Sequence, residues 1–371
     1  MQASDTGSSS NGDIVGKEDM QAAVFYGPNS ISVERAPSPF LQGRPALEVK
    51  SCAVCGYDVR VFRNGHRKVS PPVILGHEIC GQATENIDVR GGVRIRKGSR
   101  VALYPIVPCL ACQYCHAGQY NMCTDLQEIG STLDGGFAQY VGVPEQTIKI
   151  GGLVQVPDGL SDEEASLLEP LACCLNGIYQ MGPFAAPARP AVIIGDGPVG
   201  LLHLQLFKNL VGARTAVVGR VQSRMQKARS MGADAVLEYG DDNNGDDVAA
   251  AVMDFTGKAG AGSVVIAAGS PAAFDLAVRV AGKNSKISLF AGMPGAQRFS
   301  LDANWLHYNQ VSVMGAFSSV PGRLEEAARL AKEGIVDLSQ IVTHRYSLAE
   351  VEKAIHTAET YSGLRAVINK F

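Results

Sequence analysis

Four cysteines occur in one short stretch of the chain, in the spacing C-x2-C-x2-C-x7-C. They are Cys109, Cys112, Cys115 and Cys123. Four thiolates spaced in this way can surround one tetrahedral Zn2+ in a closed, structural site. Two disulfides are the alternative, and an iron–sulfur cluster also binds four cysteines, although its usual spacings differ from this one. We predict zinc, because the first residues lack the basic and apolar regions of a secretory leader and the thiols are expected to stay reduced.

A glycine-rich loop, GDGPVG, follows the apolar run AVII and precedes a helical pattern. Glycines in this strand–loop–helix context let backbone N–H groups approach a pyrophosphate, whose charge the helix N-terminus favours. The loop residues concerned are Gly195, Gly197, Pro198, Val199 and Gly200. A flexible turn is the alternative, but the strand, the helix and the continuing βαβ pattern together predict a dinucleotide site.

The residues after the second strand bear on which dinucleotide is bound. Sites for the unphosphorylated ribose usually carry Asp or Glu about 20 residues beyond the glycine loop. This chain has Gly219 there, followed by Arg220, with Arg224 one helical turn later. No carboxylate repels a 2′-phosphate and two guanidinium groups are available to pair with one, so we predict NADP(H) over NAD(H). The alternative is that both arginines are solvated charges at a helix start.

A further set of metal-binding side chains is dispersed along the sequence. Cys55 stands in CGYD, His77 and Glu78 stand in LGHE, and Glu169 stands in EPLACCLNG. Thiolate, imidazole and carboxylate are all competent zinc ligands, and a catalytic zinc keeps one position open for water or substrate. Each residue alone has an ordinary explanation, as a buried thiol, a core histidine or a helix-start glutamate. Their occurrence with the cysteine quartet and the glycine loop predicts a catalytic metal site.

These motifs require two structural settings. From residue 21 to about residue 152, Gly and Pro interrupt short β-rich runs, which indicates an irregular, mostly β domain. After about residue 170, apolar strands alternate with helices, which is typical of a parallel sheet covered on both faces. The helix after the first of these strands carries Gln205, Lys208 and Asn209 on one polar face. We predict an α/β protein whose final segment returns to the first domain.

Length and composition agree with this division. The 371 residues, 46% of them hydrophobic, exceed what one core usually fills. A formal charge of -3, from 33 basic and 36 acidic side chains, argues against nucleic-acid binding. No apolar run approaches the roughly 20 residues of a membrane-spanning helix. We expect residues 1–20 to be a disordered polar tail and the protein to be cytoplasmic.

Taken in order, the cysteine quartet, PPVILGHE, DGGFAQYV, EPLACCLNG and GDGPVG resemble the zinc-dependent medium-chain dehydrogenases/reductases. The resemblance covers nearly the whole chain after the tail. It is closest to the sorbitol and threonine dehydrogenase-like branch, since Glu78 follows His77 and Glu169 stands where the alcohol dehydrogenases have a cysteine.

The resemblance implies a division of the chain into two domains. A GroES-like catalytic domain would comprise residues 21–172 and 317–371, with a structural zinc lobe at about residues 105–125. A Rossmann domain would comprise residues 173–316. The family also suggests a homodimer or homotetramer, with residues 311–315 as an interface edge.

The resemblance also implies roles for individual residues. Cys55 and His77 would be inner-sphere zinc ligands. Glu78 and Glu169 would bind directly, through water or by exchange, and which of them is inner-sphere stays open. The zinc would polarise an alcohol whose hydride passes to the nicotinamide. Backbone after the fourth and fifth strands of the parallel sheet would line the nicotinamide site. These residues are Ala268, Gly269, Ala291 and Gly292.

One position departs from the family pattern. Ser or Thr commonly stands two residues after the first zinc ligand and passes the alcohol proton outward, whereas this chain has Tyr57. The phenol either relays the proton, or it blocks part of the pocket and leaves proton release to water. The neighbouring Asp58 is expected to support the local backbone rather than catalysis.

We therefore expect an NAD(P)-dependent zinc enzyme that acts on a small secondary alcohol or polyol, or on the matching ketone. It would hold a catalytic and a structural Zn2+ and favour NADP(H). Two alternatives stay open. One is the same fold acting on an amino alcohol or a sugar phosphate with NAD(H), and the other is a catalytically silent nucleotide-binding relative. Neither nucleic acid nor a membrane is expected as a partner.

Overall fold

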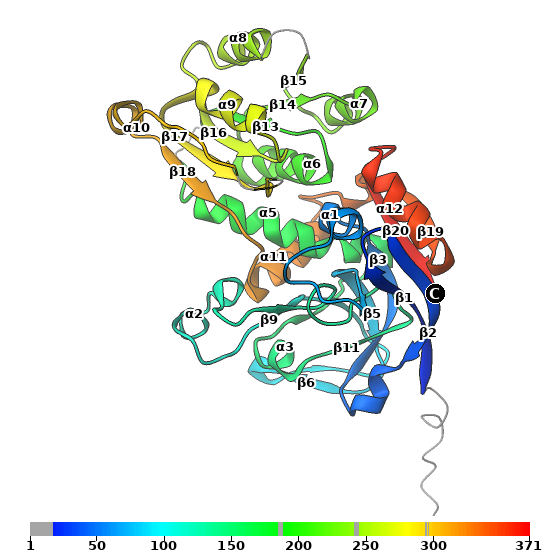
Figure 1. Cartoon of the computed structure of the whole chain (residues 1–371). Helices are drawn as coiled ribbons and strands as arrows, with labels where there is room; N and C mark the ends of the chain where they lie inside the picture. The colour runs from blue at the N-terminus through cyan, green and yellow to red at the C-terminus, as the bar shows by residue number, and fades with distance from the viewer. Residues whose placement is uncertain (1–17, 185–187, 241–244, 294, 296) are drawn as a thin grey trace, which may run out of the picture.

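The computed structural model describes residues 18–184, 188–240, 245–293, 295 and 297–371. Its elements form two bodies, a mostly β body below and a parallel α/β body above (Figure 1). Most of the expected tail, residues 1–17, lies outside the described residues. The first strand begins at Asp19, two residues before the expected start of the first domain.

The lower body is built on a sheet whose path through the described residues is β12-β8-β5-β3-β20-β19, with β11 also paired to β3. Smaller sheets, β2-β1-β4, β9-β10 and β6-β7, accompany it. The strands of this body are β1 (Asp19–Gly27), β2 (Ser30–Pro37), β3 (Ala46–Ala53), β4 (Val73–Ile74), β5 (Glu78–Ala83), β6 (Ile87–Val89), β7 (Val93–Ile95), β8 (Arg100–Leu103), β9 (Ile106–Val107), β10 (Gln127–Glu128), β11 (Tyr140–Gly142), β12 (Leu153–Gln155), β19 (Val342–Ser347) and β20 (Arg365–Lys370).

The C-terminal segment completes this sheet. Strand β20 pairs antiparallel with β3, with Ile368 opposite Cys52, and β19 pairs parallel with β20. The last two strands of the chain therefore belong to the same sheet as β3. This pairing also places Arg365, the first residue of β20, near the end of β3.

The upper body is a parallel sheet in the order β15-β14-β13-β16-β17-β18. In chain order this is 3-2-1-4-5-6, and the order reverses between β13 and β16, where dinucleotides bind at the carboxyl ends of the strands. The prediction of a Rossmann sheet is confirmed. The strands are β13 (Ala191–Ile194), β14 (Thr215–Gly219), β15 (Ala235–Glu238), β16 (Ala261–Ile266), β17 (Ala281–Leu289) and β18 (Ser312–Gly315).

Helices cover both faces of this parallel sheet. Ile193 of β13 packs into one apolar cluster with residues of α6 and α7, whereas Val192 and Ile194 pack into another with residues of α8 and α9. Alternate residues of a strand point to opposite faces, so both faces of β13 are buried. The helices are α1 (Gly56–Asn64), α2 (Gln113–His116), α3 (Glu145–Lys149), α4 (Asp162–Ser166), α5 (Leu168–Gln180), α6 (Pro198–Gln205), α7 (Gln222–Ser230), α8 (Asp246–Phe255), α9 (Pro271–Val280), α10 (Ala303–Asn309), α11 (Pro321–Lys332) and α12 (Val351–Glu359).

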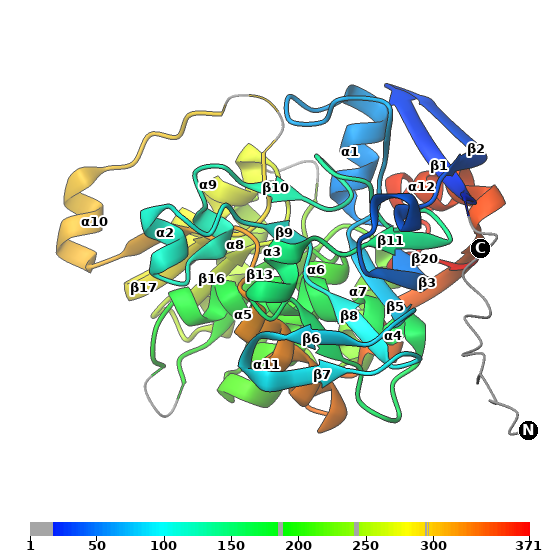
Figure 2. The same cartoon turned by 90° about the horizontal axis from the view of Figure 1, so that it is seen from below.

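Helix length bears on the expectation about membranes. Among the described residues, no helix combines the length and apolar character needed to cross a bilayer. Most of the helices belong to the layers around the two sheets, as the view from below also shows (Figure 2).

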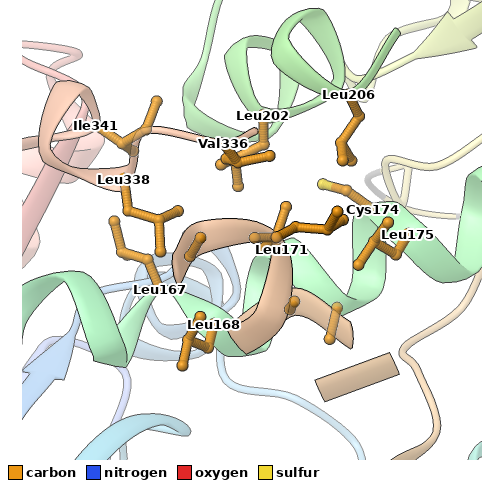
Figure 3. Packing of buried hydrophobic residues seen from close by; sticks show 14 of the residues in the cluster. Leu167, Leu168, Leu171, Cys174, Leu175, Leu202, Leu206, Val336, Leu338 and Ile341 are labelled. Carbon is orange, nitrogen blue, oxygen red and sulfur yellow. The ribbon is translucent and has the colours of Figure 1, made fainter. Parts of the chain in front are cut away.

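Helix α5 joins the two bodies through a shared apolar cluster. Its buried side chains pack with residues of the segment after the glycine loop and of the C-terminal segment (Figure 3). The labelled members are Leu167, Leu168, Leu171, Cys174, Leu175, Leu202, Leu206, Val336, Leu338 and Ile341. Each such side chain contributes about 1.5–3 kcal/mol when fully buried, so the position of α5 is firmly fixed. The helix is continuous across the expected domain boundary at residue 172.

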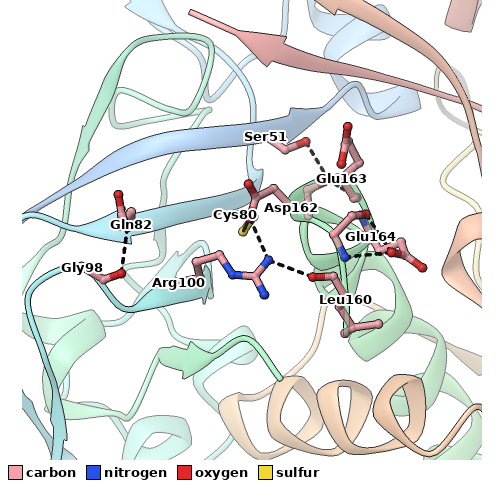
Figure 4. Close-up of polar contacts among 11 residues, drawn as sticks. Ser51, Cys80, Gln82, Gly98, Arg100, Leu160, Asp162, Glu163 and Glu164 are labelled. Carbon is pink, nitrogen blue, oxygen red and sulfur yellow. Dashed lines mark hydrogen bonds and ion pairs between the residues drawn. The ribbon is translucent and has the colours of Figure 1, made fainter. Parts of the chain in front are cut away.

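The short helix α4 fixes the start of α5 by polar contacts (Figure 4). Arg100 donates to the carbonyl oxygen of Leu160 at 2.8 Å and pairs with Asp162 at 3.1 Å. Ser161 caps α4, because its hydroxyl accepts from the backbone N–H of Glu164 at 3.2 Å. These contacts hold the chain just before the first turn of α5.

One surface expectation is wrong. Gln205, expected on a polar helix face, is buried. Its side-chain amide donates to the carbonyl oxygen of Asp337 at 3.2 Å, and its carbonyl accepts from the Asp337 N–H at 2.7 Å. The C-terminal segment covers this face of α6, so the polar side chain satisfies buried backbone instead of water.

Candidate active site

Cys55, His77 and Glu78 meet at one end of the main β-sheet. Strands β3 and β5 pair antiparallel with Ala53 opposite Glu78. Cys55 therefore follows the end of β3 at the edge where His77 precedes β5. One ligand atom from each of these three side chains lies within 4.8 Å of the others. The sheet register thus brings together residues that stand 22 positions apart in the sequence.

Asp58 orients two of these groups from the first turn of α1. One carboxylate oxygen accepts from the backbone N–H of Cys55 at 2.8 Å. The other lies 3.5 Å from Nδ1 of His77, and the Asp58 side chain is fully buried. Asp58 supports the backbone as expected, but it also faces His77. A carboxylate behind a histidine fixes the ring orientation of a metal ligand.

The charges and polar atoms around His77 favour the binding of a metal cation. Burial lowers the pKa of His77, but the neighbouring Asp58 carboxylate, together with Cys55, raises it well above its usual value. Nδ1 of His77, Oδ1 of Asp58 and both oxygens of Glu78 are buried without a hydrogen-bond partner. The cluster is anionic, and several of its polar atoms lack hydrogen bonds. Its thiol, imidazole and carboxylate are a set of donors that fits Zn2+.

Arg365 is a member of this cluster that sequence reasoning missed. Its guanidinium lies 3.1 Å from Oε1 of Glu78, and both side chains are buried. It also donates to the carbonyl oxygen of Val54 at 2.9 Å. Arg365 arrives from β20, 287 residues beyond Glu78, so only the pairing of β20 with β3 places it there. No local motif identifies it.

Glu169 approaches the same region from the first turn of α5. It is 7% exposed, and one of its carboxylate oxygens accepts from the thiol of Cys173 at 3.1 Å. Burial raises the pKa of Glu169 to about 7, His77 lowers it, and the Glu78 carboxylate raises it. Glu169 is therefore within electrostatic range of both, although its oxygens lie outside the closest ligand group. Cys173 was not expected at the site.

Tyr57 lies between His77 and two polar side chains. Its ring makes an edge contact with the His77 ring at 5.7 Å between centroids. Its hydroxyl lies 2.8 Å from the hydroxyl of Ser131 and 3.4 Å from Nδ1 of His66. Burial raises the pKa of Tyr57, so the phenol keeps its proton at neutral pH. Ser131 and His66 were not identified from the sequence as partners of Tyr57.

The cysteine quartet forms a separate cluster around α2. All four cysteines are free thiols, and their sulfur atoms lie within 4.8 Å of one another. Their Sγ–Sγ distances include 3.5 Å for Cys112–Cys115, 3.9 Å for Cys109–Cys115 and 4.0 Å for Cys112–Cys123. Four sulfurs placed tetrahedrally at 2.3 Å from a zinc ion would be separated by about 3.8 Å. A disulfide needs about 2.05 Å, so the geometry fits the ion and not the bridge.

The glycine loop packs tightly at the reversal point of the parallel sheet. A β-carbon placed on Gly200 would collide with the carbonyl oxygen of Gly195, so the helix lies directly on the strand. A β-carbon on Gly197, by contrast, would meet only a guanidinium nitrogen of Arg224, at 3.9 Å. Pro198 and Val199 open α6. The N-terminus of α6 is thus arranged as anion-binding helix ends usually are.

Two further pairs of expected residues lie beside this loop. Ala268 and Gly269 follow β16, and Ala291 and Gly292 follow β17. A β-carbon on Gly269 would collide with the carbonyl oxygen of Gly292. One on Gly195 would lie 3.0 Å from the backbone N of Ala268. The carboxyl ends of the three strands therefore form one continuous edge.

The backbone at the end of β14 contacts a carboxylate from an unexpected position. Asp196, inside the glycine loop, accepts from the backbone N–H groups of Arg220 and Val221, each at 2.8 Å. Its carboxylate lies so close to Gly219 that a β-carbon there would be 2.5 Å from Oδ2. Arg220 is exposed, with its guanidinium 4.7 Å from the centre of the Tyr239 ring.

The second arginine is engaged differently. Arg224 is buried and donates through Nε to the carbonyl oxygen of Gly363 at 2.8 Å. Its guanidinium also lies 5.0 Å from the centre of the Tyr361 ring. Arg224 therefore links α7 to the loop before β20, and only Arg220 presents its side chain to solvent.

Family models match both halves of the chain. Residues 42–158 match the alcohol dehydrogenase GroES-like domain, and residues 198–333 match the zinc-binding dehydrogenase model. The sorbitol dehydrogenase of Halalkalibacterium halodurans is 31% identical over 353 residues, covering 92% of this chain and 96% of that protein. The D-arabitol-phosphate dehydrogenase of Enterococcus avium is 30% identical over 315 residues, covering 83% of this chain and 84% of that protein.

A solved structure shows the same architecture over almost the full length. It is a provisionally assigned zinc-binding dehydrogenase from Sinorhizobium meliloti, bound to NADP. Its TM-score to this chain is 0.81 at 27% sequence identity, and the match covers 95% of this chain and 100% of that one.

Proposed function

The chain belongs to the zinc-dependent medium-chain dehydrogenases/reductases, as an NAD(P)-dependent alcohol or polyol dehydrogenase, and from this premise we propose that it uses NADP(H) and a secondary alcohol or polyol, or the matching ketone. The observation that carries the proposal is the convergence of Cys55, His77 and Glu78 within 4.8 Å. The proposed binding of NADP(H) is supported by the glycine loop at the reversal point of the parallel sheet.

The proposed zinc ligands are Cys55 and His77 with a carboxylate. Bound zinc would polarise the substrate oxygen and lower the pKa of the alcohol. Asp58 would hold both Cys55 and His77 in ligand geometry through its two carboxylate oxygens. The carboxylate is either Glu78 or Glu169. Glu78 lies closer, but its charge is already balanced by Arg365, whereas Glu169 has no ion pair among the described residues.

We propose that Tyr57 relays the alcohol proton outward. Its hydroxyl is hydrogen-bonded to Ser131 and lies near His66, which is exposed to solvent. This chain of polar groups supports a proton relay through Tyr57 over the alternative that the phenol only blocks part of the pocket. Tyr57→Phe is expected to lower kcat and change its pH profile. Ser131→Ala, which leaves the ring in place, is expected to give a smaller change of the same kind. Unchanged kinetics in Tyr57→Phe would refute the relay.

We propose NADP(H) as the preferred cofactor, with Arg220 as the contact to the 2′-phosphate. Gly219 offers no carboxylate at the usual position, and Arg220 is exposed at the end of β14. Arg224 would act by fixing the turn, because its guanidinium is bonded to Gly363. Arg220→Ala is expected to lower kcat/KM for NADP+ at least tenfold and to leave NAD+ nearly unaffected. A wild-type preference for NAD+ would show that Arg220 is a solvated charge.

The experiment that tests the activity is a screen of NADP+ and NAD+ reduction over secondary alcohols, polyols and amino alcohols. Oxidation of a secondary alcohol or polyol supports the proposal. Oxidation of amino alcohols alone would favour the second candidate function. Sugar phosphates belong in the same screen, because one of the similar relatives is a D-arabitol-phosphate dehydrogenase. No turnover with any of these substrates, combined with tight cofactor binding, would favour a silent nucleotide-binding protein.

We also propose a structural zinc at Cys109, Cys112, Cys115 and Cys123, supported by the tetrahedral spacing of their sulfur atoms. Nine free cysteines support a reducing location such as the cytoplasm. The expected division at residues 172 and 316 is supported by the six strands of the parallel sheet β15-β14-β13-β16-β17-β18, which fall between residues 191 and 315.

The proposed dimer uses the edge strand β18. Among the described residues this strand pairs only with β17, and it exposes Val313, while Tyr308 of α10 is 76% exposed. An unpaired edge beside exposed apolar side chains favours pairing with a second copy. Light scattering should give at least a dimer, and Val313→Lys should shift it toward monomer. A monomeric wild type would contradict this interface.

A further inference from the structure

A tight turn beside Tyr57 carries two adjacent cations that the proposed hydride transfer does not use. The Val69 N–H donates to the His66 carbonyl oxygen at 2.9 Å and closes the turn over Arg67 and Lys68. The His66 ring makes an edge contact with Tyr57 at 5.4 Å, and Tyr57 contacts His77 at 5.7 Å. The two imidazole centres are therefore separated by no more than the sum of these distances. A short polyol chain held at His77 can reach this turn.

The hydrogen bonds of His66 fix which nitrogen carries its proton. The backbone N–H of Lys68, which can only donate, points at Nδ1 of His66 at 3.3 Å. Nδ1 is then an acceptor, and the neutral ring carries its hydrogen on Nε2. Burial lowers the pKa of His66, and the cations Lys68, Arg67 and Arg60 lower it further, so the neutral form is favoured. His66 thus offers a single N–H donor.

The cations around His66 have no acidic partner at contact distance. Arg60, Arg67 and Lys68 are exposed, and none of them forms an ion pair with any described residue. The carboxylate of Glu128 lies within electrostatic range of Lys68. Burial raises the pKa of Glu128, while the charges of His77 and, more weakly, of Lys68 lower it. The charges of Lys68 and His77 therefore act on the same carboxylate.

We propose that His66, Arg67 and Lys68, here called the cationic turn, bind an anionic end group of the substrate. The substrate class would be a polyol that carries a phosphate monoester or a carboxylate at the end remote from the reacting carbinol. This inference rests on the proposed function. Its physical basis is that unpaired Arg and Lys side chains beside an N–H donor attract and bind such anions, whereas a neutral polyol gains nothing from them.

The test compares three six-carbon substrates, namely sorbitol, sorbitol 6-phosphate and gluconate. Wild-type protein is expected to give a kcat/KM at least tenfold higher for one of the two anions than for sorbitol. The double variant Arg67→Ala/Lys68→Ala is expected to reduce that ratio at least tenfold, mainly through KM. Which anion is favoured identifies the end group.

A matched control removes the same two charges elsewhere. Arg96 and Lys97 are an adjacent, exposed Arg–Lys pair after β7, and the β6–β7 hairpin lies far from α1 and the turn that follows it (Figure 2). Arg96→Ala/Lys97→Ala should keep the wild-type ratio. A similar loss in both double variants would show that general charge, and not the cationic turn, attracts the anion, and would overturn the inference.

Binding of inorganic phosphate provides a readout that needs no turnover. Titration calorimetry should detect phosphate binding to the wild type, and weakening of at least tenfold in Arg67→Ala/Lys68→Ala but not in the control. Sorbitol oxidised at least as well as both anions, with no phosphate bound, would overturn this inference and leave the proposed dehydrogenase intact. Absence of any alcohol oxidation, with phosphate still bound at the turn, would instead count against the proposed function.

Discussion

Introducing an acidic residue at position 219, in the proposed cofactor site, should destabilise the protein unless Asp196 is changed as well. An Asp at position 219 would supply the usual contact to an unphosphorylated ribose. In this chain a β-carbon at that position would lie 2.5 Å from Oδ2 and 2.7 Å from Cβ of Asp196. Asp196 cannot move away cheaply, because its Oδ2 accepts from the backbone N–H groups of Arg220 and Val221.

The expected loss in the free energy of unfolding of Gly219→Asp follows from these contacts. Overpacking in a tight region costs about 1–3 kcal/mol. Weakening one hydrogen bond to a charged acceptor costs about 1.5–3 kcal/mol, and two carboxylates about 4 Å apart repel by about 4 kcal/mol at an effective dielectric constant near 20. These costs overlap as the loop relaxes, so we expect Gly219→Asp to lower the free energy of unfolding by about 3 kcal/mol or more. For a domain of this size, that corresponds to a fall of about 6 °C in Tm.

The assay is a double-mutant cycle in Asp196→Ala and Gly219→Asp, followed by calorimetry and by kcat/KM for both cofactors. The double variant should be more stable than the sum of the single effects predicts, by at least about 1.5 kcal/mol, because the two carboxylates no longer compete. It should also shift preference toward NAD+. Gly219→Ala is the control for the steric part alone. Wild-type stability in Gly219→Asp, or strictly additive effects, would refute the reasoning.

Three other perturbations test separate parts of the molecule. Burial lowers the pKa of His203 to about 4, so the unfolded state binds more protons between pH 6.5 and 4. Stability should fall by about 2 kcal/mol from pH 7 to pH 5, and His203→Gln should flatten this slope in urea titrations, whereas an unaltered slope would exclude His203 as the cause. Arg365→Ala leaves the buried Glu78 carboxylate unpaired and should cost about 3–5 kcal/mol in denaturant unfolding. Adding Glu78→Gln should recover part of that loss, and no recovery would argue against the pair. Cys112→Ser should remove about one zinc per chain and lower Tm, and retention of all zinc in metal analysis would count against the four-thiolate site.

The features predicted from the sequence are those that depend on residues close together in the chain. Apolar runs identified the strands of the parallel sheet, and the glycine loop was placed correctly because its strand and helix are adjacent in the chain. Cys55 and His77 were grouped in the sequence as metal-binding side chains that occur together with the other motifs, and the register of β3 with β5 explains why the two side chains lie close together. The four cysteines of the quartet also lie close together in the sequence, and their sulfur atoms lie within 4.8 Å of one another in the structure.

What the sequence did not reveal depends on contacts between distant segments. Arg365 reaches Glu78 only because β20 pairs with β3. Gln205 is buried by the C-terminal segment, and Arg224 is held by Gly363. A charged or polar residue at such a position looks like an ordinary surface residue in the sequence, because its partner lies more than 100 positions away. The role of Asp196 was hidden differently, since nothing in a glycine loop indicates where its side chain points.

Zinc content measured alongside activity tests the central claim most directly. Purified wild-type protein should contain about two zinc ions per chain, and Cys55→Ala should contain about one and lose NADP+ reduction with every alcohol. The matched control is Cys52→Ala, which removes a buried thiol outside the proposed ligand set and should keep both ions. A Cys55→Ala protein that retains two zinc ions and full activity would contradict the account.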